Sequence, residues 1–519
     1  MRSVPHRPLG APPPTLAGEI RTHSAAVTPG DVFVAIPGRR VDGARFAREA
    51  VLRGARVVVA EVPPPAGLPL EGVTWLMVPA ARAALSRLAA NRYGHPSARL
   101  RVTGVTGTTG KTTTAMLLRH LLTAGGRPAG LVGSLAIHTG LRQLDGGLTT
   151  PDPLDLHFFL EEMVRAGMDD AVVEVSSQGV DQARVDDVDF DLGVVTNLAP
   201  LEHLEYHAGY DDYVAAKARF VAMIPPRGAV VMGEGEARAR LAPAARAPVV
   251  TFGRSPGCDV RLAGMWIDGW TSRLHVTVRG PLPLAGRPRA AASLAPSPRE
   301  PYSLELRTQL LGPHHATNVL AAAAAALCLG AVPEEIETAL PLFPPPRRRT
   351  QVLMREPFTV IDDTAGHPDS IAASLQVAAA LPHRRIVVVY AVRGGRGVEV
   401  NAANGMRLAR EAGRLGAAVI VTASQGDTSE GDAVRPAEWK ACTGAMAAGG
   451  LLPVVYPRLP EALAAALETV REGDLLLLLG AQGMDRGAAY LEAMLAPAAV
   501  PSALAALPGG AFEDGSFVV

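Results

Sequence analysis

A glycine-punctuated segment at residues 106–113, Thr-Gly-Thr-Thr-Gly-Lys-Thr-Thr, has the residue types of a phosphate-binding loop. It follows a β-branched run and opens an amphipathic stretch, so it is predicted to join a strand to a helix. In such a turn, backbone N–H groups face an anion, Lys111 supplies positive charge, and the Thr112 hydroxyl can bind Mg²⁺. The strict motif requires glycine where Val105 stands. The segment therefore predicts a shorter variant of a nucleoside triphosphate site; a tight turn that binds nothing is the alternative.

Lysine is rare in this chain. Of the 50 Lys and Arg residues only Lys111, Lys217 and Lys440 are lysine, so arginine supplies the ordinary surface charge. Lysine differs from arginine because it is a compact point charge and can lose its proton. Lys111 and Lys217 are therefore candidates for chemistry.

Three more side chains could hold a metal ion. Glu174 ends a predicted strand at 170–175, where a carboxylate beside a triphosphate suits a hard cation. His203 lies in a polar segment, where a histidine is more often a surface residue. Lys217 lies on a predicted helix at 213–220. A lysine desolvated beside other cations loses its proton, and the neutral amine can react with carbon dioxide to give a carbamate, which is an oxygen ligand.

The bulk composition limits the classes of protein. At 519 residues the chain is long enough for about three domains. Its 50 basic and 50 acidic residues balance, which argues against a nucleic-acid or anionic membrane surface. Its three cysteines are widely spaced and give no disulfide framework or zinc site. The apolar runs are too short for membrane insertion, so a cytoplasmic protein is expected.

The elements that must position these residues alternate between strand and helix. We predict an α/β fold with a small N-terminal α/β domain at 1–98, a central parallel-sheet domain of the P-loop NTPase kind at 99–345, and a Rossmann-like C-terminal domain at 346–519. Ligands of parallel sheets collect at the carboxyl ends of strands. Glu174, Ser176, Ser177, Thr196 and Asn197 all follow predicted strands and are expected at that edge.

Several motifs in order resemble the Mur ligases, and most closely the MurE type, which adds the third residue of the peptidoglycan stem peptide. The matching segments are 106–113, Thr-Thr-Pro-Asp at 149–152, Glu-Val-Ser-Ser at 174–177, Thr-Asn-Leu at 196–198, His-Leu-Glu-Tyr-His at 203–207 and Tyr-Val-Ala-Ala-Lys-Ala-Arg-Phe at 213–220. Residues 31–43 are similar to the family's uridine-binding segment, and 312–322 to its adenine-contacting segment.

The resemblance implies a role for each matched residue. ATP would be held by the loop and by residues that follow it: Gly107, Thr108, Thr109, Gly110, Lys111, Thr112, Thr113, Asn197, Asn318 and Arg349. Mg²⁺ would be held by Thr112, Glu174, His203 and carbamylated Lys217. The UDP-linked muramoyl substrate would be held by Ser24, Thr149, Thr150, Ser176, Gln182 and Arg184. Lys111, Lys217, Glu174 and His203 would be the catalytic set, with Asp363 at the domain junction.

The implied reaction is ATP-dependent amide formation. A carboxylate of UDP-N-acetylmuramoyl-L-alanyl-D-glutamate would accept the γ-phosphoryl group of ATP, and an amino acid would then attack the acyl phosphate. Bringing these substrates together implies a third domain that closes, with hinges near residues 96 and 345. A monomer is expected.

The third domain departs from the family pattern. The motif Asn-Pro-Arg, which selects diaminopimelate, is absent from 423–430, and Gly-Lys-Gly-His-Glu is replaced around 480–485. The amine therefore stays open between diaminopimelate, another diamino acid such as ornithine or lysine, and a different amine. The loop 393–397 could line the changed pocket or be a plain surface loop. The alternatives for the whole chain are a Mur-like ligase acting on a different carboxylate and a non-catalytic nucleotide-binding paralogue.

Overall fold

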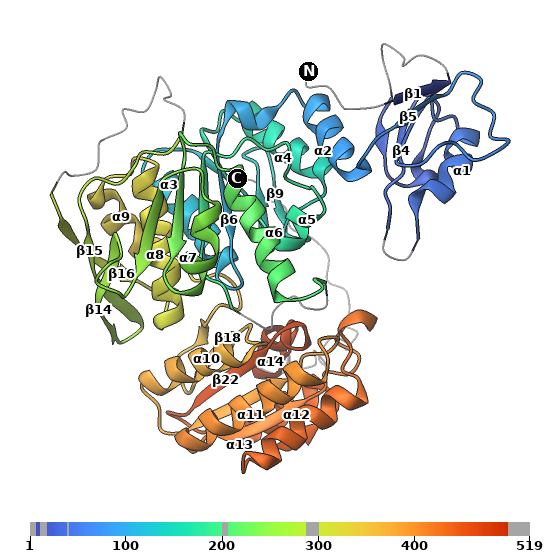
Figure 1. The fold of residues 1–519 in the computed structure, drawn as a ribbon. Helices are drawn as coiled ribbons and strands as arrows, with labels where there is room; N and C mark the ends of the chain where they lie inside the picture. The colour runs from blue at the N-terminus through green and yellow to red at the C-terminus, as the bar shows by residue number, and fades with distance from the viewer. Residues whose placement is uncertain (1–6, 11–17, 39–40, 200–205, 287–299, 497–519) are drawn as a thin grey trace, which may run out of the picture.

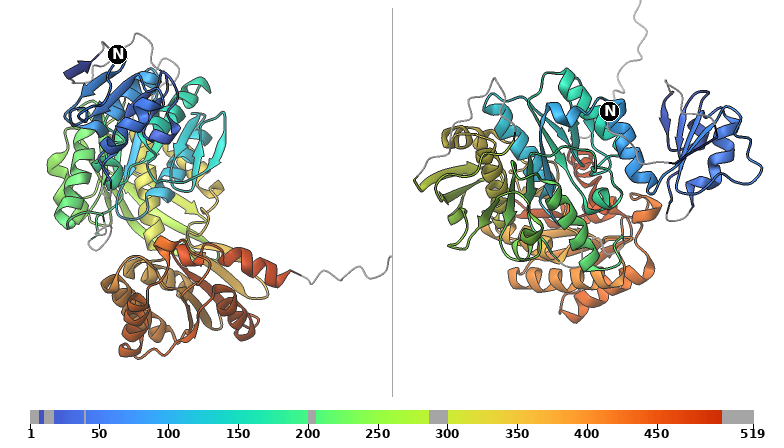
Figure 2. Two further views of the ribbon diagram at one scale, coloured as in Figure 1. Left: turned by 90° about the vertical axis from the view of Figure 1, so that its right-hand side faces the viewer. Right: turned by 45° about the horizontal axis from the view of Figure 1, so that its top comes forward.

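The chain folds into three α/β domains, each built on one sheet (Figure 1). The structure is a computed structural model that describes residues 7–10, 18–38, 41–199, 206–286 and 300–496. In Figure 1 the first domain lies at the right, the central domain at the left and centre, and the third domain below; Figure 2 shows the same arrangement from two other sides. The predicted fold class is confirmed, whereas the exact domain boundaries stay predictions.

The first domain has a five-stranded sheet in the order β1-β5-β4-β3-β2, parallel except for β1. Its helix α2 packs on the sheet through Ala81 and Leu85 and also contacts α4 of the central domain. This helix therefore joins the two domains. The elements are β1 (Arg7–Gly10), β2 (Ile20–Arg21), β3 (Val32–Val34), α1 (Ala47–Leu52), β4 (Val57–Ala60), β5 (Thr74–Met77) and α2 (Ala81–Arg92).

The central sheet has eleven strands in the order β16-β15-β14-β13-β12-β11-β6-β10-β7-β8-β9. From β13 through β12, β11, β6 and β10 to β7 the strands run parallel, and antiparallel hairpins extend both edges. The strands are β6 (Arg101–Thr106), β7 (Ala129–Val132), β8 (Ala136–His138), β9 (Gln143–Asp145), β10 (Asp170–Glu174), β11 (Leu192–Val195), β12 (Ala229–Gly233), β13 (Val249–Gly253), β14 (Val260–Asp268), β15 (Thr271–Val278) and β16 (Tyr302–Thr308).

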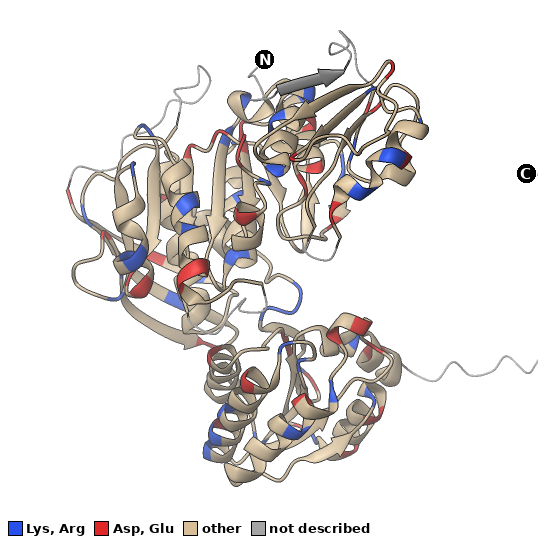
Figure 3. Cartoon of the chain, turned by 45° about the vertical axis from the view of Figure 1, so that its right-hand side comes forward, with Lys and Arg blue, Asp and Glu red and all other residues tan. Residues whose placement is uncertain are grey.

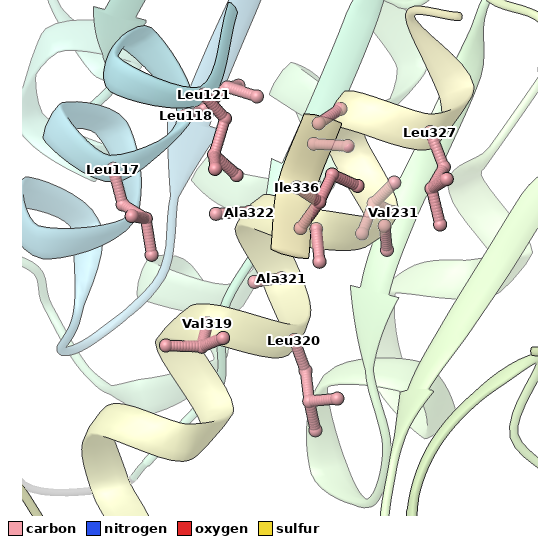
Figure 4. Close-up of a cluster of buried hydrophobic side chains, with 14 of the residues drawn as sticks. Leu117, Leu118, Leu121, Val231, Val319, Leu320, Ala321, Ala322, Leu327 and Ile336 are labelled. Atoms are coloured by element: carbon pink, nitrogen blue, oxygen red, sulfur yellow. The ribbon is translucent and has the colours of Figure 1, made fainter. Parts of the chain in front are cut away.

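Helices cover both faces of this sheet and enclose two cores. On one face the alanine-rich helix α8 is so narrow that α3 approaches it closely; Leu117 and Leu118 lie across from Ala322 in Figure 4. This packing fixes where α3, and so the phosphate loop, sits against the sheet. The helices are α3 (Lys111–Ala124), α4 (Pro153–Arg165), α5 (Ser177–Asp181), α6 (Tyr210–Met223), α7 (Glu236–Leu241), α8 (Pro313–Cys328) and α9 (Pro333–Ala339).

The third domain is a six-stranded sheet in the order β17-β18-β22-β19-β20-β21, parallel except for β17. Helices α10 to α12 cover one face, and α13 and α14 cover the other. The elements are β17 (Gln351–Met354), β18 (Thr359–Asp363), α10 (Pro368–Ala380), β19 (Ile386–Ala391), α11 (Val398–Leu415), β20 (Ala418–Thr422), α12 (Pro436–Ala448), β21 (Val454–Tyr456), α13 (Leu459–Thr469), β22 (Leu475–Gly480) and α14 (Gly487–Leu495).

Basic and acidic residues are interspersed along the chain in all three domains (Figure 3). Within the described ranges, none of the helices combines the length and the apolar character that crossing a membrane requires.

Candidate active site

The predicted phosphate loop lies between β6 and α3, at the carboxyl edge of the central sheet. Gly107 and Gly110 both have left-handed φ values, +143° and +82°. A Cβ at Gly107 would lie 1.9 Å from Thr196 Oγ1, and one at Gly110 would lie 2.2 Å from Asn318 Oδ1. Both positions therefore require glycine for two reasons: the backbone is left-handed, and a Cβ atom would collide with a neighbouring side chain.

Asn197 follows β11, the strand that pairs with β6, and forms hydrogen bonds with this loop. Its Oδ1 accepts a hydrogen bond from the Thr109 N–H at 3.0 Å, and its Nδ2 donates to Thr109 Oγ1 at 3.0 Å. Lys111 Nζ folds back and donates to the carbonyl oxygens of Gly107 and Thr108 at 2.9 and 3.0 Å. The lysine charge therefore lies at the mouth of the loop, where phosphate oxygens can take the place of these carbonyls.

Glu174, the last residue of β10, is buried directly behind the loop. Its carboxylate accepts hydrogen bonds from Thr112 Oγ1 at 3.0 Å, from the Ser134 N–H at 2.9 Å and from Ser134 Oγ at 3.2 Å. Burial raises the pKa of the Glu174 carboxyl, against the lowering effects of the Ser134 N–H, Lys111 and Thr112. A carboxylate and a hydroxyl side by side beside a phosphate loop are oxygen donors of the kind Mg²⁺ takes, so these two residues fit that ion.

His203 lies outside the described residues. Within the part of the chain that the structure describes, no three His, Cys, Asp or Glu side chains gather closely enough to hold a metal ion. Of the four predicted Mg²⁺ ligands, the structure therefore describes Thr112, Glu174 and Lys217.

Lys217 of α6 is buried under the phosphate loop, with a side chain among the largest that are fully enclosed. Its Nζ donates to Thr106 Oγ1 and to the Gly107 carbonyl, both at 3.1 Å, and lies 4.7 Å from the centre of the Tyr213 ring. Among the described residues no carboxylate forms an ion pair with it. Burial, and after it the charge of Lys111, holds the pKa of Lys217 well below its usual value. Its amine is therefore able to be neutral and nucleophilic.

The residues predicted for the acid substrate form one hydrogen-bonded group next to Glu174. Thr150 Oγ1 donates to the Glu174 carbonyl at 2.9 Å and accepts from the Ser176 N–H at 2.9 Å. Arg184 donates to the Thr150 carbonyl at 2.6 Å and to Gln182 Oε1 at 2.8 Å. Thr149 joins the group through Ser134 Oγ at 3.0 Å.

Ser24 is the one predicted substrate residue apart from this group. It begins a short 3₁₀ turn in the first domain, and its hydroxyl donates to Glu49 Oε2 at 2.8 Å.

The linker into the third domain carries two neighbouring arginines with different partners. Arg348 donates to Asp362 Oδ1 and to the Ala481 carbonyl, both at 3.2 Å, and also contacts Gly480 and Asp485. Arg349 instead lies between the two domains: burial lowers its pKa, and the charges of Asp363 of the third domain and Glu174 of the central domain raise it. The linker is thus fixed to the third domain at one residue and faces the phosphate site at the next.

Backbone conformation marks the same linker. Arg348 and Thr350 have left-handed φ values of +56° and +50°, which non-glycine residues seldom adopt. Thr350 Oγ1 and Ser374 Oγ donate to Asp363 Oδ2 at 3.2 and 2.5 Å. Asp363 therefore holds the linker to α10 at the domain junction.

Sequence models of three Mur ligase domains match the chain in order: the family's catalytic domain at 18–93, its middle domain at 105–326 and its glutamate ligase domain at 348–482. A UDP-N-acetylmuramoyl-L-alanyl-D-glutamate–2,6-diaminopimelate ligase of Geobacter metallireducens is 33% identical over 482 residues, which cover 88% of each chain. The chain belongs to the Mur ligase family. The Streptomyces coelicolor protein of the same name is 31% identical over 92% of this ligase and 90% of its own length.

Solved structures share the fold of this ligase. MurF from Acinetobacter baumannii superposes with a TM-score of 0.63 at 22% identity and covers 92% of both chains. The Mycobacterium tuberculosis folylpolyglutamate synthase, complexed with ADP and AMPPCP, gives a TM-score of 0.60 at 18% identity, covering 80% of this ligase and 95% of that chain. Family membership makes this protein an ATP-dependent ligase that forms an amide bond.

The loop 393–397 of the ligase is bound through three of its backbone N–H groups. Glu438 of α12 accepts hydrogen bonds from the N–H groups of Gly395, Arg396 and Gly397 at 3.2, 2.9 and 2.6 Å, and from Arg435 at 3.0 Å. The loop is therefore held by an internal carboxylate, and the N–H groups of Gly395, Arg396 and Gly397 are not available to a substrate.

Several residues of the site carried no recognisable signal in the sequence. Ser134 follows β7 in an ordinary Gly-Ser turn, and only the fold brings it to Glu174. Tyr213 had a usable signal, because residues four apart share a helix face and Lys217 lies four positions on. Glu438 lies 41 residues after Gly397, so no local pattern could join them.

Proposed function

We propose that this ligase joins an amino acid to the D-glutamate carboxylate of UDP-N-acetylmuramoyl-L-alanyl-D-glutamate, using ATP. The observation that carries the proposal is the buried Lys217, which has no carboxylate partner in the described part of the chain and lies against the phosphate loop beside Lys111. Relatives that align over most of the chain are named as ligases of UDP-N-acetylmuramoyl-L-alanyl-D-glutamate, which supports the acid substrate.

In the proposed roles, Lys111 and the loop N–H groups bind the β- and γ-phosphates, while Asn318 and Arg349 bind the rest of the nucleotide. Phosphate oxygens concentrate negative charge as the γ-phosphoryl group moves, and a fixed lysine stabilises that charge without having to reorganise. Asn197 keeps the loop in shape. The adjacency of Asn318 to Gly110 supports its role.

Thr112, Glu174, His203 and carbamylated Lys217 are the proposed holders of Mg²⁺. The bound ion would offset phosphate charge. Lys217 becomes an oxygen ligand when its neutral amine attacks carbon dioxide, forming an N–C bond and releasing one proton. The low pKa of its amine supports this modification.

The acid substrate is held by the hydrogen-bonded group around Thr150, by Arg184 and, at its uridine end, by Ser24. Its carboxylate oxygen attacks the γ-phosphorus, the bond to the β-phosphate oxygen breaks, and ADP leaves. The amine then attacks the acyl carbon, loses a proton and displaces inorganic phosphate.

We assign uridine binding to the first domain (1–98), ATP binding to the central domain (99–345) and amine binding to the third domain (346–519). We also propose that the protein acts as a monomer in the cytoplasm, where its nucleotide substrates are found.

A second candidate function is the same reaction on a different carboxylate. It is favoured by the third domain, where Asp485 stands in the replaced segment and is bound to Arg348. Diaminopimelate, ornithine, lysine and unrelated amines therefore all belong in the test.

The test is to incubate the protein with ATP, Mg²⁺, the UDP-linked muramoyl dipeptide and a panel of amino acids, following phosphate release and product mass. We expect one amine to give a product heavier by that amine less water. Phosphate release with another carboxylate but not with this dipeptide would favour the second candidate, and absence of turnover with any pair would favour the non-catalytic alternative.

A further inference from the structure

Arg82 links two domains at the edge of the acid-substrate site. It is the second residue of α2, the helix that joins the first domain to the central one. Its guanidinium donates to the Pro37 carbonyl of the first domain at 3.2 Å and to Gln182 Oε1 of the central domain at 3.4 Å. Neither the phosphate loop nor the family motifs include this residue.

Two guanidinium groups converge on one uncharged oxygen. Gln182 Oε1 also accepts from Arg184 Nη2 at 2.8 Å. Arg184 has Asp152 at 3.2 Å as a counter-charge, but no carboxylate pairs with Arg82 among the residues that the structure describes. Two half-buried or buried positive groups that share a neutral acceptor favour the binding of an anion between them.

We propose that Arg82, together with Arg184, binds the diphosphate of the acid substrate. This inference rests on the proposed function, in which the substrate is linked to uridine diphosphate. Ser24 lies in the first domain and Thr150 beside Glu174, so the diphosphate between the two substrate ends must pass where the two domains meet. Arg82 is held at that boundary by contacts to both sides.

The competing explanation is that Arg82 only stabilises the contact between the two domains. Arg87, on the same helix, has such a structural role, since it pairs with the Asp187 carboxylate of the central domain. Arg82 differs because its two partners are a backbone carbonyl and an amide, which leave its charge uncompensated.

The first experiment compares Arg82→Ala with Arg87→Ala as a matched control. We expect Arg82→Ala to raise the KM for the UDP-linked dipeptide, and the inhibition constant of UDP, by about ten- to a hundredfold, the usual effect of losing a charged hydrogen-bonding partner. The inhibition constant of uridine, which carries no phosphate, stays the same, and Arg82→Lys restores part of the loss. In Arg87→Ala we expect UDP and uridine inhibition to change by the same factor. Equal effects of Arg82→Ala on UDP and uridine would overturn the proposal.

The second experiment introduces a charge. Gln182→Glu pairs with both arginines, so we expect the melting temperature to rise while UDP inhibits less strongly. A higher melting temperature with unchanged UDP inhibition would mean that both arginines are structural. Failure of the proposed function is a separate result: the wild-type protein would then turn over a carboxylate that carries no uridine diphosphate, and UDP would not inhibit it.

Discussion

At the scale of single residues, Lys217 gives the sharpest prediction. Lys217→Ala removes the amine that is proposed to carry the carbamate, so we expect kcat to fall by at least roughly 10²- to 10³-fold. Short carboxylates such as acetate or formate should restore part of the activity, because they can place an oxygen where the carbamate oxygen was. Steady-state phosphate release with and without added carboxylate measures both effects.

The control for this prediction is Lys440→Ala. Lys440 is the third lysine of the chain and is exposed on α12. Its variant should keep full activity and show no response to carboxylates. Full activity of Lys217→Ala without rescue would contradict the proposed carbamate.

His157 gives a prediction about stability in acid. This imidazole is completely buried in α4, and neither ring nitrogen has a hydrogen-bond partner. Burial lowers its pKa to about 4, from 6.5 in an unfolded chain. Its stabilising contribution is therefore complete above pH 6.5, and it is lost as the pH falls towards 4, because the unfolded chain then binds a proton that the folded chain does not. The loss approaches about 3 kcal/mol.

His157→Leu should remove this acid sensitivity. Between pH 7 and pH 4 we expect the free energy of unfolding of the wild type to fall by up to about 3 kcal/mol more than that of the variant. Urea unfolding at several pH values measures the difference. His383→Gln, at an exposed position, should follow the wild type; parallel curves for the wild type and His157→Leu would refute the prediction.

At the scale of elements, the close approach of α3 and α8 depends on alanine. Ala322 is completely buried and faces leucines of α3 (Figure 4). Ala322→Leu must push the helices apart or force strained rotamers, so we expect a loss of about 1–3 kcal/mol in the free energy of unfolding. Because α3 begins at Lys111, the same variant should also weaken ATP binding. Ala464→Leu on the exposed side of α13 is the matched control.

Elements also show what the sequence could predict. The short apolar run at 418–422 predicts a strand, and the structure has β20 (Ala418–Thr422) there. The alanine-rich run at 317–329 predicts a helix that starts at 317, whereas α8 begins at Pro313, because proline is favoured in a first turn. The strands β14 to β16 are not among the predicted elements, although alternate residues of β15 and β16 are buried, such as Leu304 and Leu306, and this period of two was a usable signal.

The same contrast holds for the candidate site. Residues that share a short motif, such as Lys111 and Thr112, could be predicted together. Contacts such as Thr112 to Glu174, 62 positions apart, follow from strand order in the sheet, which parallel topology anticipates. The contact between Arg82 and Gln182 spans two domains and 100 positions, and nothing local encodes it.

At the scale of the whole molecule, Arg349 should couple the nucleotide to the position of the third domain. In the wild type, ATP with the acid substrate is expected to reduce the radius of gyration as the domain closes. Arg349→Ala should bind ATP more weakly and lose this reduction. Small-angle X-ray scattering and nucleotide titration measure the two effects. Arg347→Ala, at an exposed neighbouring position, should behave as wild type; compaction of Arg349→Ala like that of the wild type would refute the coupling.

The adjacency of Arg348 and Arg349 has a consequence for the order in which substrates bind. Their Cα atoms are about 3.8 Å apart. Because Arg348 is bound to Asp362 of the third domain, Arg349 at the nucleotide site can move little relative to that domain. The coupling between ATP binding and domain closure is reciprocal. If closure raises the affinity for ATP by some factor, bound ATP raises the equilibrium constant for closure by the same factor. In the proposed function the third domain binds the amine, so we expect the affinity for the amine to rise once ATP is bound and the amine to be the last substrate to enter.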